Sequence, residues 1–189
     1  MKNTLLPKEI TLAHGSGGQA MQQLIEGLFL QAFDNPLLAE REDQARLPLA
    51  ALSAQGDRLA FTTDSYVIDP IEFPGGDIGK LAVCGTVNDL AVSGALPRYL
   101  SCGLILEEGL AGETLLRIVN SMAQTARDAG IQIVTGDTKV VPRGAADKIF
   151  INTAGIGVIP HAVHWGTGEI RPGDRLIVSG TLGIMAPLS

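Results

Sequence analysis

The sequence has few cysteines, no long apolar stretch and fewer basic than acidic residues, and each shortage excludes a class of protein. Only Cys84 and Cys102 occur in 189 residues. They lack zinc-type spacing and lie in apolar stretches, so we expect small core residues and a cytoplasmic protein with reduced thiols. No apolar run approaches the roughly 20 residues that span a bilayer. The net charge of −6 disfavours nucleic acid and anionic membranes as main partners.

Glycine, in contrast, is abundant. There are 23 glycines in 189 residues, about 12% against roughly 7% in average proteins. Because glycine enters positive φ freely, this excess predicts tight turns or backbone that approaches a ligand closely. The apolar content of 46% and charged content of 18% are typical of a globular protein.

Periodicity and turn residues predict a mixed α+β domain. It occupies residues 1–160, and residues 161–189 form a linker and the first strand, at 171–183, of an incomplete C-terminal domain. The glycine and proline after residue 93 and Gly130 mark helix ends. The expected elements are a helix at 19–33, a strand at 57–68, a buried helix at 78–94, a strand at 98–108, an amphipathic helix at 111–130, and strands at 131–141 and 147–160.

Three aspartates interrupt otherwise apolar elements: Asp64 in AFTTDSYV, Asp89 in GTVNDLAV and Asp137 in IVTGDTKV. One such aspartate is most often a helix cap or a turn residue. Three together favour a shared hard cation such as Mg²⁺, because an unpaired buried carboxylate is costly and Mg²⁺ prefers carboxylate and phosphate oxygens. Asp43, in a polar loop, is either a fourth ligand or a solvated acid. The sequence therefore predicts that the three aspartates converge in space.

The segment HGSGGQA at 14–20 precedes the first expected helix. Its glycines permit close backbone approach, and a helix N-terminus favours an anion. The segment also satisfies the dinucleotide pattern G-x-G-x-x-A through Gly15, Gly17 and Ala20, which leaves a small dinucleotide-binding domain as an alternative. The absence of repeated βαβ units in the expected element order weighs against that alternative.

Lys139 and Asp137 share one face of their strand, because alternate residues of a strand point the same way. The two side chains could simply form an ion pair. Alternatively, the ammonium group could neutralise phosphate charge beside a metal-binding carboxylate, with the Thr138 hydroxyl as a further contact.

The motifs TTDSYV, VNDLAVSGALP and VTGDTKV, in this order and spacing, resemble the superfamily of aminoimidazole ribonucleotide synthetase, thiamin-monophosphate kinase and selenophosphate synthetase. Within it, LAHGSGGQAMQQLI and DSYVIDPIEFPGGDIGKLAVCGTVNDLAVSGA look closest to the HypE family of hydrogenase maturation proteins. The resemblance runs from about Ile10 to Gly183. It implies a mixed sheet with helices on one side, which dimerises as half of a barrel closed by strands of both chains.

The resemblance also implies a site for ATP and Mg²⁺. Asp64, Asp89 and Asp137 would hold the metal, and Lys139 would be the catalytic lysine. The glycines would form a mobile segment over the phosphates. The implied nucleotide-binding positions are Gly15, Gly17, Gly18, Asp43, Asp64, Asn88, Asp89, Asp137 and Thr138.

The activity implied by the resemblance is ATP-dependent dehydration. Family members carry a carbamoyl group on the thiol of a C-terminal cysteine and convert it to a thiocyanate, the source of cyanide for [NiFe] hydrogenase. The implied partners are a second copy of the chain, the carbamoyltransferase HypF and the HypC–HypD complex.

The end of the sequence departs from the family. The family pattern continues after SGTLG with Asp-His-Gly-Ala-Thr-Ile-Leu-Asn, whereas this sequence ends in IMAPLS. Deleting one nucleotide from a codon series for the family segment reproduces Ile-Met-Ala-Pro-Leu-Ser and a stop. We therefore expect a frameshifted, truncated product that does not complete the reaction. The competing hypothesis is a non-catalytic dimerisation and interaction module of the maturation machinery.

Overall fold

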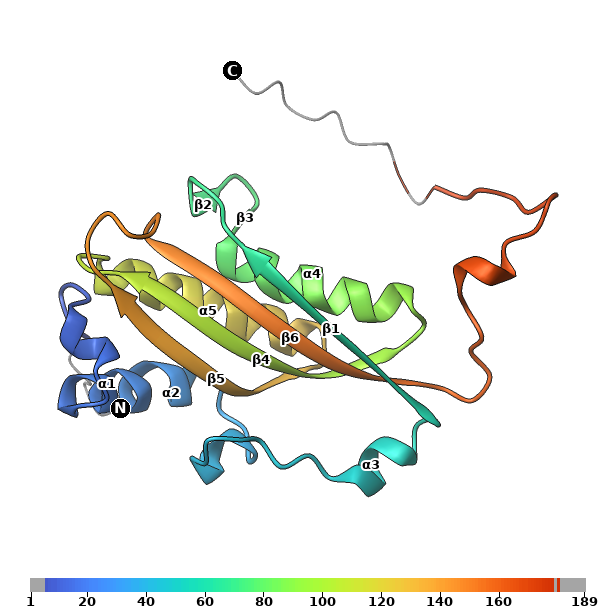
Figure 1. Cartoon of the computed structure of the whole chain (residues 1–189), viewed down its shortest axis with the longest axis horizontal. Helices are drawn as coiled ribbons and strands as arrows, with labels where there is room; N and C mark the ends of the chain where they lie inside the picture. The colour runs from blue at the N-terminus through green and yellow to red at the C-terminus, as the bar shows by residue number, and fades with distance from the viewer. Residues whose placement is uncertain (1–5, 179, 181–189) are drawn as a thin grey trace, which may run out of the picture.

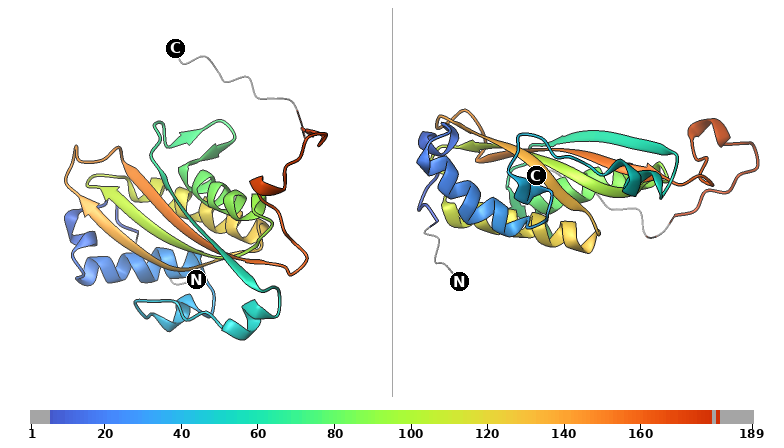
Figure 2. Two further views of the ribbon diagram at one scale, coloured as in Figure 1. Left: turned by 45° about the vertical axis from the view of Figure 1, so that its right-hand side comes forward. Right: turned by 90° about the horizontal axis from the view of Figure 1, so that it is seen from below.

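The computed structural model describes residues 6–178 and 180. One four-stranded sheet forms its centre, in the order β1 (Arg58–Tyr66), β6 (Ile149–Ile159), β4 (Leu96–Glu107) and β5 (Gln132–Val141) (Figure 1). β4 and β5 are parallel, whereas β6 is antiparallel to both of its neighbours. Helices cover one face of the sheet only, as the view from below shows (Figure 2). This arrangement confirms the expected α+β fold with a mixed sheet and helices on one side.

Two long helices, α4 (Ile78–Val92) and α5 (Gly112–Asp128), contact each other on the covered face. The N-terminal helices extend this layer beyond α5, next to β5 (Figure 1). They are η1 (Leu12–Gly15), α1 (Gln19–Leu24), the π-helix η2 (Ile25–Phe29) and α2 (Leu30–Ala32). The smaller elements are η3 (Leu38–Glu40), α3 (Leu49–Ser53), the hairpin of β2 (Glu72–Phe73) and β3 (Gly76–Asp77), and η4 (Thr167–Glu169).

Local sequence signals account for the two long helices. α4 begins where the Asp77 carboxylate accepts a hydrogen bond from the backbone N–H of Lys80 at 2.8 Å, which satisfies a donor that no helical carbonyl can reach. α5 buries an apolar stripe that includes Leu115, Ile118 and Met122. It ends just before Gly130, whose φ of 67° suits the left-handed turn that follows many helices.

Alternation along β6 divides the sheet into a covered face and an open face. Ile149, Ile151 and Thr153 are buried toward the helices, and the residues between them face the open side. On the covered face Tyr66, Thr86 and Thr153 form a buried chain of hydroxyl groups that joins β1, α4 and β6. The register of the strands then fixes which face every other residue of the sheet occupies.

Three expectations are wrong or incomplete. Residues 171–178 of the strand expected at 171–183 form no strand, and the remainder of that range, apart from Gly180, lies outside the described residues, as does IMAPLS. Cys84 is exposed rather than buried in the core. The helix expected to be buried at 78–94 is buried on one side only. None of the described helices is long and apolar enough to cross a membrane.

Candidate functional site

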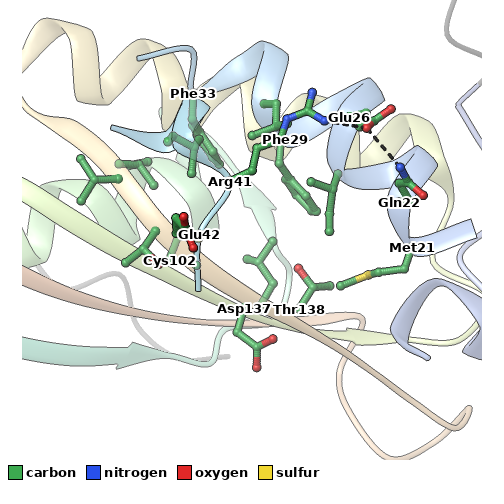
Figure 3. Close-up of a pocket in the computed structure, with 18 of the residues that line it drawn as sticks. Met21, Gln22, Glu26, Phe29, Phe33, Arg41, Glu42, Cys102, Asp137 and Thr138 are labelled. Carbon is green, nitrogen blue, oxygen red and sulfur yellow. Dashed lines mark hydrogen bonds and ion pairs between the residues drawn. The ribbon is translucent and has the colours of Figure 1, made fainter. Parts of the chain in front are cut away.

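A pocket of about 590 Å³ lies between the N-terminal helices and the outer strand β5 (Figure 3). This volume is within the usual range for small-molecule sites, and the lining has their usual character, apolar walls with a few polar groups. Met21, Ile25, Phe29 and Phe33 from the helices form one wall. The opposite wall comes from β4 and β5, and the segment after η3 closes one end. The further lining residues are Gly17, Gln22, Glu26, Leu30, Leu37, Leu38, Arg41, Glu42, Cys102, Leu104, Ile133, Val134, Thr135, Gly136, Asp137 and Thr138.

The polar groups at the helical wall are connected to one another. Glu26 Oε1 accepts hydrogen bonds from Arg41 at 2.9 Å and from Gln22 at 3.3 Å (Figure 3). Arg41 adopts a left-handed backbone with φ of 56°, which is uncommon for a residue other than glycine. Glu26 itself lies in the π-helix, a rare conformation that occurs often at functional sites. Sequence periodicity predicts the helix at 19–33 but does not reveal this π-helical segment.

The glycine-rich segment and β5 meet at this pocket. Gly15 packs so closely on β5 that a Cβ there would lie 2.7 Å from the backbone nitrogen of Val140. Gly17 has a φ of 77° and lines the pocket, and no heavy atom lies within 4 Å of a Cβ built at Gly18. Thr138 is buried and points toward the helices, whereas the Asp137 carboxylate points away from them (Figure 3). Gly15, Gly17, Gly18 and Thr138 are therefore brought together as one group.

Asp137 and Lys139 lie beside this group on the open face. Lys139 Nζ is 3.1 Å from Asp137 Oδ2, and both side chains are about two-thirds exposed, at 65% and 66%. An exposed pair of this kind contributes little to stability. The ion pair between them is present, and it leaves both groups accessible from solvent.

A second group of predicted site residues lies at the opposite edge of the sheet. Asp64 is on β1, and Asn88 and Asp89 are on α4, all exposed. Thr62 Oγ1 donates to Asp89 Oδ2 at 3.4 Å, and Asp64 Oδ1 accepts from the backbone N–H of Ser65 at 2.7 Å. Since Thr62 and Asp64 are two residues apart on one strand face, roughly 7 Å separates them along β1. Asp64 and Asp89 are thus neighbours.

The three aspartates do not converge within one chain. Asp64 pairs with Thr153, which pairs with Cys102, which pairs with Gly136, the residue before Asp137. Three strand spacings separate the two edges by about 14 Å. Asp137, one residue on, faces the other side of the sheet. Among the described residues no group of three His, Cys, Asp or Glu side chains could hold a metal ion.

The carboxylates are also exposed rather than buried, so the premise that each needs a partner to offset burial is wrong for the single chain. Strand alternation carries Asp137 to the open face, the outer side of α4 carries Asp89 to the surface, and Asp64 is exposed on the edge strand β1 although it shares a face with buried Tyr66. Sequence alternation gives the face of a residue but not the edge on which its strand lies.

A row of residues in register, polar on three of its four strands, crosses the open face and was not predicted. Ser65 on β1, Asn152 on β6, Gly103 on β4 and Asp137 on β5 are in register. The Asn152 amide donates to Ser65 Oγ at 2.9 Å and to the Asp64 carbonyl at 3.0 Å. An asparagine in an otherwise apolar strand, FINTAGI, was the available signal. The row connects the strand of one aspartate to the strand of another.

The other residues of the sequence motifs and the two alternatives to an aspartate site have the following positions. His14 Nδ1 accepts from the backbone N–H of Thr11 at 3.0 Å, so it caps a helix. Asp43 is exposed in the loop next to the pocket-lining Glu42. Burial raises the pKa of the Cys102 thiol to about 12. The pattern at Gly15, Gly17 and Ala20 follows a 3-10 helix rather than a strand, which contradicts the context that a dinucleotide-binding motif requires.

Comparison with known proteins gives a consistent family. The model of the family described as AIR synthase related protein, N-terminal domain, matches residues 42–159. The carbamoyl dehydratase HypE of Escherichia coli strain K12 is 74% identical over 174 residues, which are 92% of this chain and 52% of that relative. Its crystal structure matches with a TM-score of 0.77 and 73% identity, over 80% of this chain and 47% of that one.

Two further solved structures are similar. One is the hydrogenase maturation protein HypE in complex with ATP, with 62% identity and a TM-score of 0.74 over 79% of this chain and 43% of that one. The other is a HypE–HypF complex, with 52% identity and a TM-score of 0.53 over 72% of this chain and 42% of that one. The chain spans about half the length of the curated relatives that it matches.

Proposed function

We propose, from the premise that the chain belongs to the AIR synthase related protein family, that it is the ATP-binding and dimerising part of a HypE-type hydrogenase maturation protein. The observation that carries the proposal is the meeting of the glycine segment with Thr138 at a pocket of about 590 Å³. The solved relative that is 62% identical to this chain is described as a complex with ATP.

The pocket beside β5, with the glycine segment and Thr138, has features suited to binding a nucleotide. The apolar wall of Met21, Ile25 and Phe29 can accept a base, because aromatic and aliphatic side chains bind planar rings through burial and stacking. Gly17 and Gly18 leave room for phosphate oxygens to approach the backbone, as open space around Gly18 indicates. The Thr138 hydroxyl would donate to the phosphates.

The magnesium site is proposed to need two copies of the chain. β1 and β5 are the two edges of the sheet, so two copies related by a twofold axis can place β1 of each beside β5 of the other and close an eight-stranded barrel. The β1 strand that carries Asp64, with Asp89 of α4 next to it, would then lie one strand spacing, about 5 Å, from the β5 strand that carries the partner's Asp137. Exposed carboxylates fit a hard cation.

Lys139 is the candidate catalytic lysine. Its ammonium group is held beside Asp137 at 3.1 Å yet remains 65% exposed, so it can turn to developing negative charge on a phosphate. In a full-length protein, Lys139→Ala should reduce the turnover rate more strongly than it reduces the affinity for ATP. Lys139→Arg, which keeps the positive charge, should leave the affinity for ATP unchanged.

The activity proposed for the full-length protein is the one named in its relatives, carbamoyl dehydratase. ATP would activate the amide oxygen of a cysteine S-carboxamide. That oxygen would leave with the γ-phosphoryl group as inorganic phosphate, and the loss of the two amide protons would give the thiocyanate. HypF, present in the complex with a relative, and the HypC–HypD complex are the proposed partners. Two free thiols are consistent with the cytoplasmic location that we propose.

Neither cysteine of this polypeptide suits the carrier role. Cys102 is buried with a pKa of about 12, and Cys84 is fixed in the middle of α4. A carrier must reach a partner enzyme and then the ATP site, which a rigid helix position prevents. We therefore expect the 189-residue polypeptide to bind ATP without completing the dehydration. We also propose that residues 1–160 form the ATP-binding and dimerising domain and that residues 161–189 belong to the start of a second domain.

Calorimetric titration of the purified chain with ATP, with and without Mg²⁺, tests the proposal. We expect Mg²⁺-dependent binding that Thr138→Val weakens by about 10- to 150-fold, because a hydrogen bond to a charged group contributes about 1.5–3 kcal/mol. Thr167→Val, at the exposed first residue of η4, is the matched control. The second candidate function, a dimerisation and interaction module, is favoured by the two free sheet edges. If the chain is only such a module, sedimentation should show dimers and calorimetry should show no Mg²⁺-dependent ATP binding.

A further inference from the structure

The open face of β6 carries an exposed asparagine among apolar residues. Asn152 lies between Phe150 and Ala154, with Ile156 further along the same face. The register between β6 and β1 is regular along the whole of β1, so the backbone already pairs the two strands. An amide at this position is therefore not required for strand pairing.

The amide nitrogen of Asn152 contacts three successive residues of β1. It lies 3.0 Å from the carbonyl oxygen of Asp64, 2.9 Å from Ser65 Oγ and 3.3 Å from Thr63 Oγ1. Thr63 donates its own proton to the Thr153 carbonyl at 3.1 Å. Because a carbonyl oxygen can only accept a hydrogen bond, the nitrogen end of the amide must face Asp64. The orientation of the asparagine side chain is thus determined by its contacts.

The peptide group between Asp64 and Ser65 connects this amide to the aspartate carboxylate. Its C=O accepts from Asn152, and its N–H donates to Asp64 Oδ1 at 2.7 Å. A trans peptide group points its C=O and N–H in opposite directions. The N–H and the carboxylate that it binds therefore lie on the side of β1 away from β6, at the free edge of the sheet (Figure 1). A hydrogen bond to the peptide oxygen also makes its N–H a stronger donor.

Asn152 and the Asp64 side chain lie on opposite faces of the sheet. Asn152 is directly opposite Ser65 in the register, and residues opposite each other share a face. Asp64, one residue before Ser65, points to the other face, which it shares with buried Tyr66. The amide therefore acts on the carboxylate through the peptide group and not by direct contact.

We propose that Asn152 is a positioning residue for the carboxylate of Asp64. It holds the Asp64–Ser65 peptide group in the orientation that keeps the carboxylate at the free edge of β1, where the partner's β5 is proposed to lie. A ligand group that is already oriented loses less conformational freedom when the metal ion binds. The inference rests on the proposed ATP and Mg²⁺ site and adds a residue to its support.

Amide hydrogen exchange of the 189-residue chain, without nucleotide or metal, tests the local step. Asn152→Leu keeps the branched shape of the side chain and removes its donors. The Ser65 N–H should then exchange about fivefold faster, the factor that corresponds to one hydrogen bond of about 1 kcal/mol. The N–H groups of buried Ile149 and Ile151 should exchange at unchanged rates. Ser65→Ala is the matched control, because it removes a different contact of the same amide and should leave exchange at position 65 unchanged.

Calorimetric titration with ATP at graded Mg²⁺ concentrations tests the consequence for the metal. Asn152→Leu should raise the Mg²⁺ concentration for half-maximal ATP binding about fivefold, whereas ATP affinity without Mg²⁺ and the Mg²⁺ dependence of Ser65→Ala should equal those of the parent chain.

A merely structural role of Asn152 would lower the urea midpoint of Asn152→Leu and leave its Mg²⁺ dependence as in the parent chain. That result, or unchanged exchange of the Ser65 N–H, would overturn the inference while the proposed function stands. A parent chain without Mg²⁺-dependent ATP binding would contradict the proposed function and overturn this inference with it.

Discussion

The hydroxyl chain beneath the sheet should fix α4 against β6, and Thr153→Val tests this. Thr153 is fully buried and donates to the Ala82 carbonyl of α4 at 3.1 Å. Each hydroxyl donates once, so Thr86 must donate to Thr153 across 2.5 Å and Tyr66 to Thr86 across 3.2 Å. Burial raises the pKa of Tyr66 above its usual value of 10.0, and the chain of donors therefore stays intact at neutral pH.

The expected loss in the free energy of unfolding follows from the number of hydrogen bonds removed. Valine has nearly the shape of threonine, so no cavity is made and only the hydrogen bonds of the hydroxyl are lost. Two bonds contribute about 1 kcal/mol each, and the Thr86 proton is left without its acceptor. We expect a loss of about 2 kcal/mol, or about 4–8 °C in melting temperature for a protein of this size.

Urea unfolding followed by circular dichroism measures the difference in the free energy of unfolding. The slope against urea should stay unchanged, because the variant exposes the same surface on unfolding. Thr167→Val, at an exposed position, should stay within about 0.5 kcal/mol of the parent protein. A Thr153→Val variant as stable as this control would refute the role of the hydroxyl chain.

Two further predictions concern the loops around the site. Gly15→Ala should destabilise the protein by about 1–3 kcal/mol, because its Cβ would lie 2.7 Å from the Val140 nitrogen. Gly18→Ala, with open space around it, should destabilise the protein less. Equal losses of unfolding free energy in urea would contradict this prediction. Glu107 accepts from two backbone N–H groups of the β5–β6 loop, which lowers the pKa of its carboxyl below 4.5. Its stabilising contribution should therefore be present above pH 4.5 and lost as the pH falls through the lowered pKa. Glu107→Gln should remove that pH dependence from amide exchange of the loop, and an unchanged acid profile would refute the assignment.

The elements of the fold could be predicted because their signals are local. The helix at α5 follows from apolar residues at three- and four-residue steps and from Gly130 after its end. Each central strand begins and ends within a few residues of the expected position. The short helix α3 at Leu49–Ser53 was missed because it directly follows Pro48, in a stretch too short to show a helical period.

The arrangement of the site could not be predicted, because it depends on the order of the strands. β6, the last strand among the described residues, inserts between β1 and β4 and so adds a strand spacing between Asp64 and Asp137, which lie on opposite edges. Motif order carries no information about this insertion. The pocket was missed for a related reason: Glu26 and Arg41 are 15 residues apart in sequence and meet only through the path of the loop.

The most direct test of the account uses dimers that contain two different variants. One chain carries Asp89→Asn and the other Asp137→Asn, each with its own affinity tag, and tandem purification yields only mixed dimers. If each site combines Asp89 of one copy with Asp137 of the other, both pure variants lose Mg²⁺-dependent ATP binding, whereas the mixed dimer keeps one intact site. Calorimetry should then find about one ATP per mixed dimer at the parent affinity. A mixed dimer with no such site, or a failure of the chains to form dimers at all, would contradict the proposed shared site.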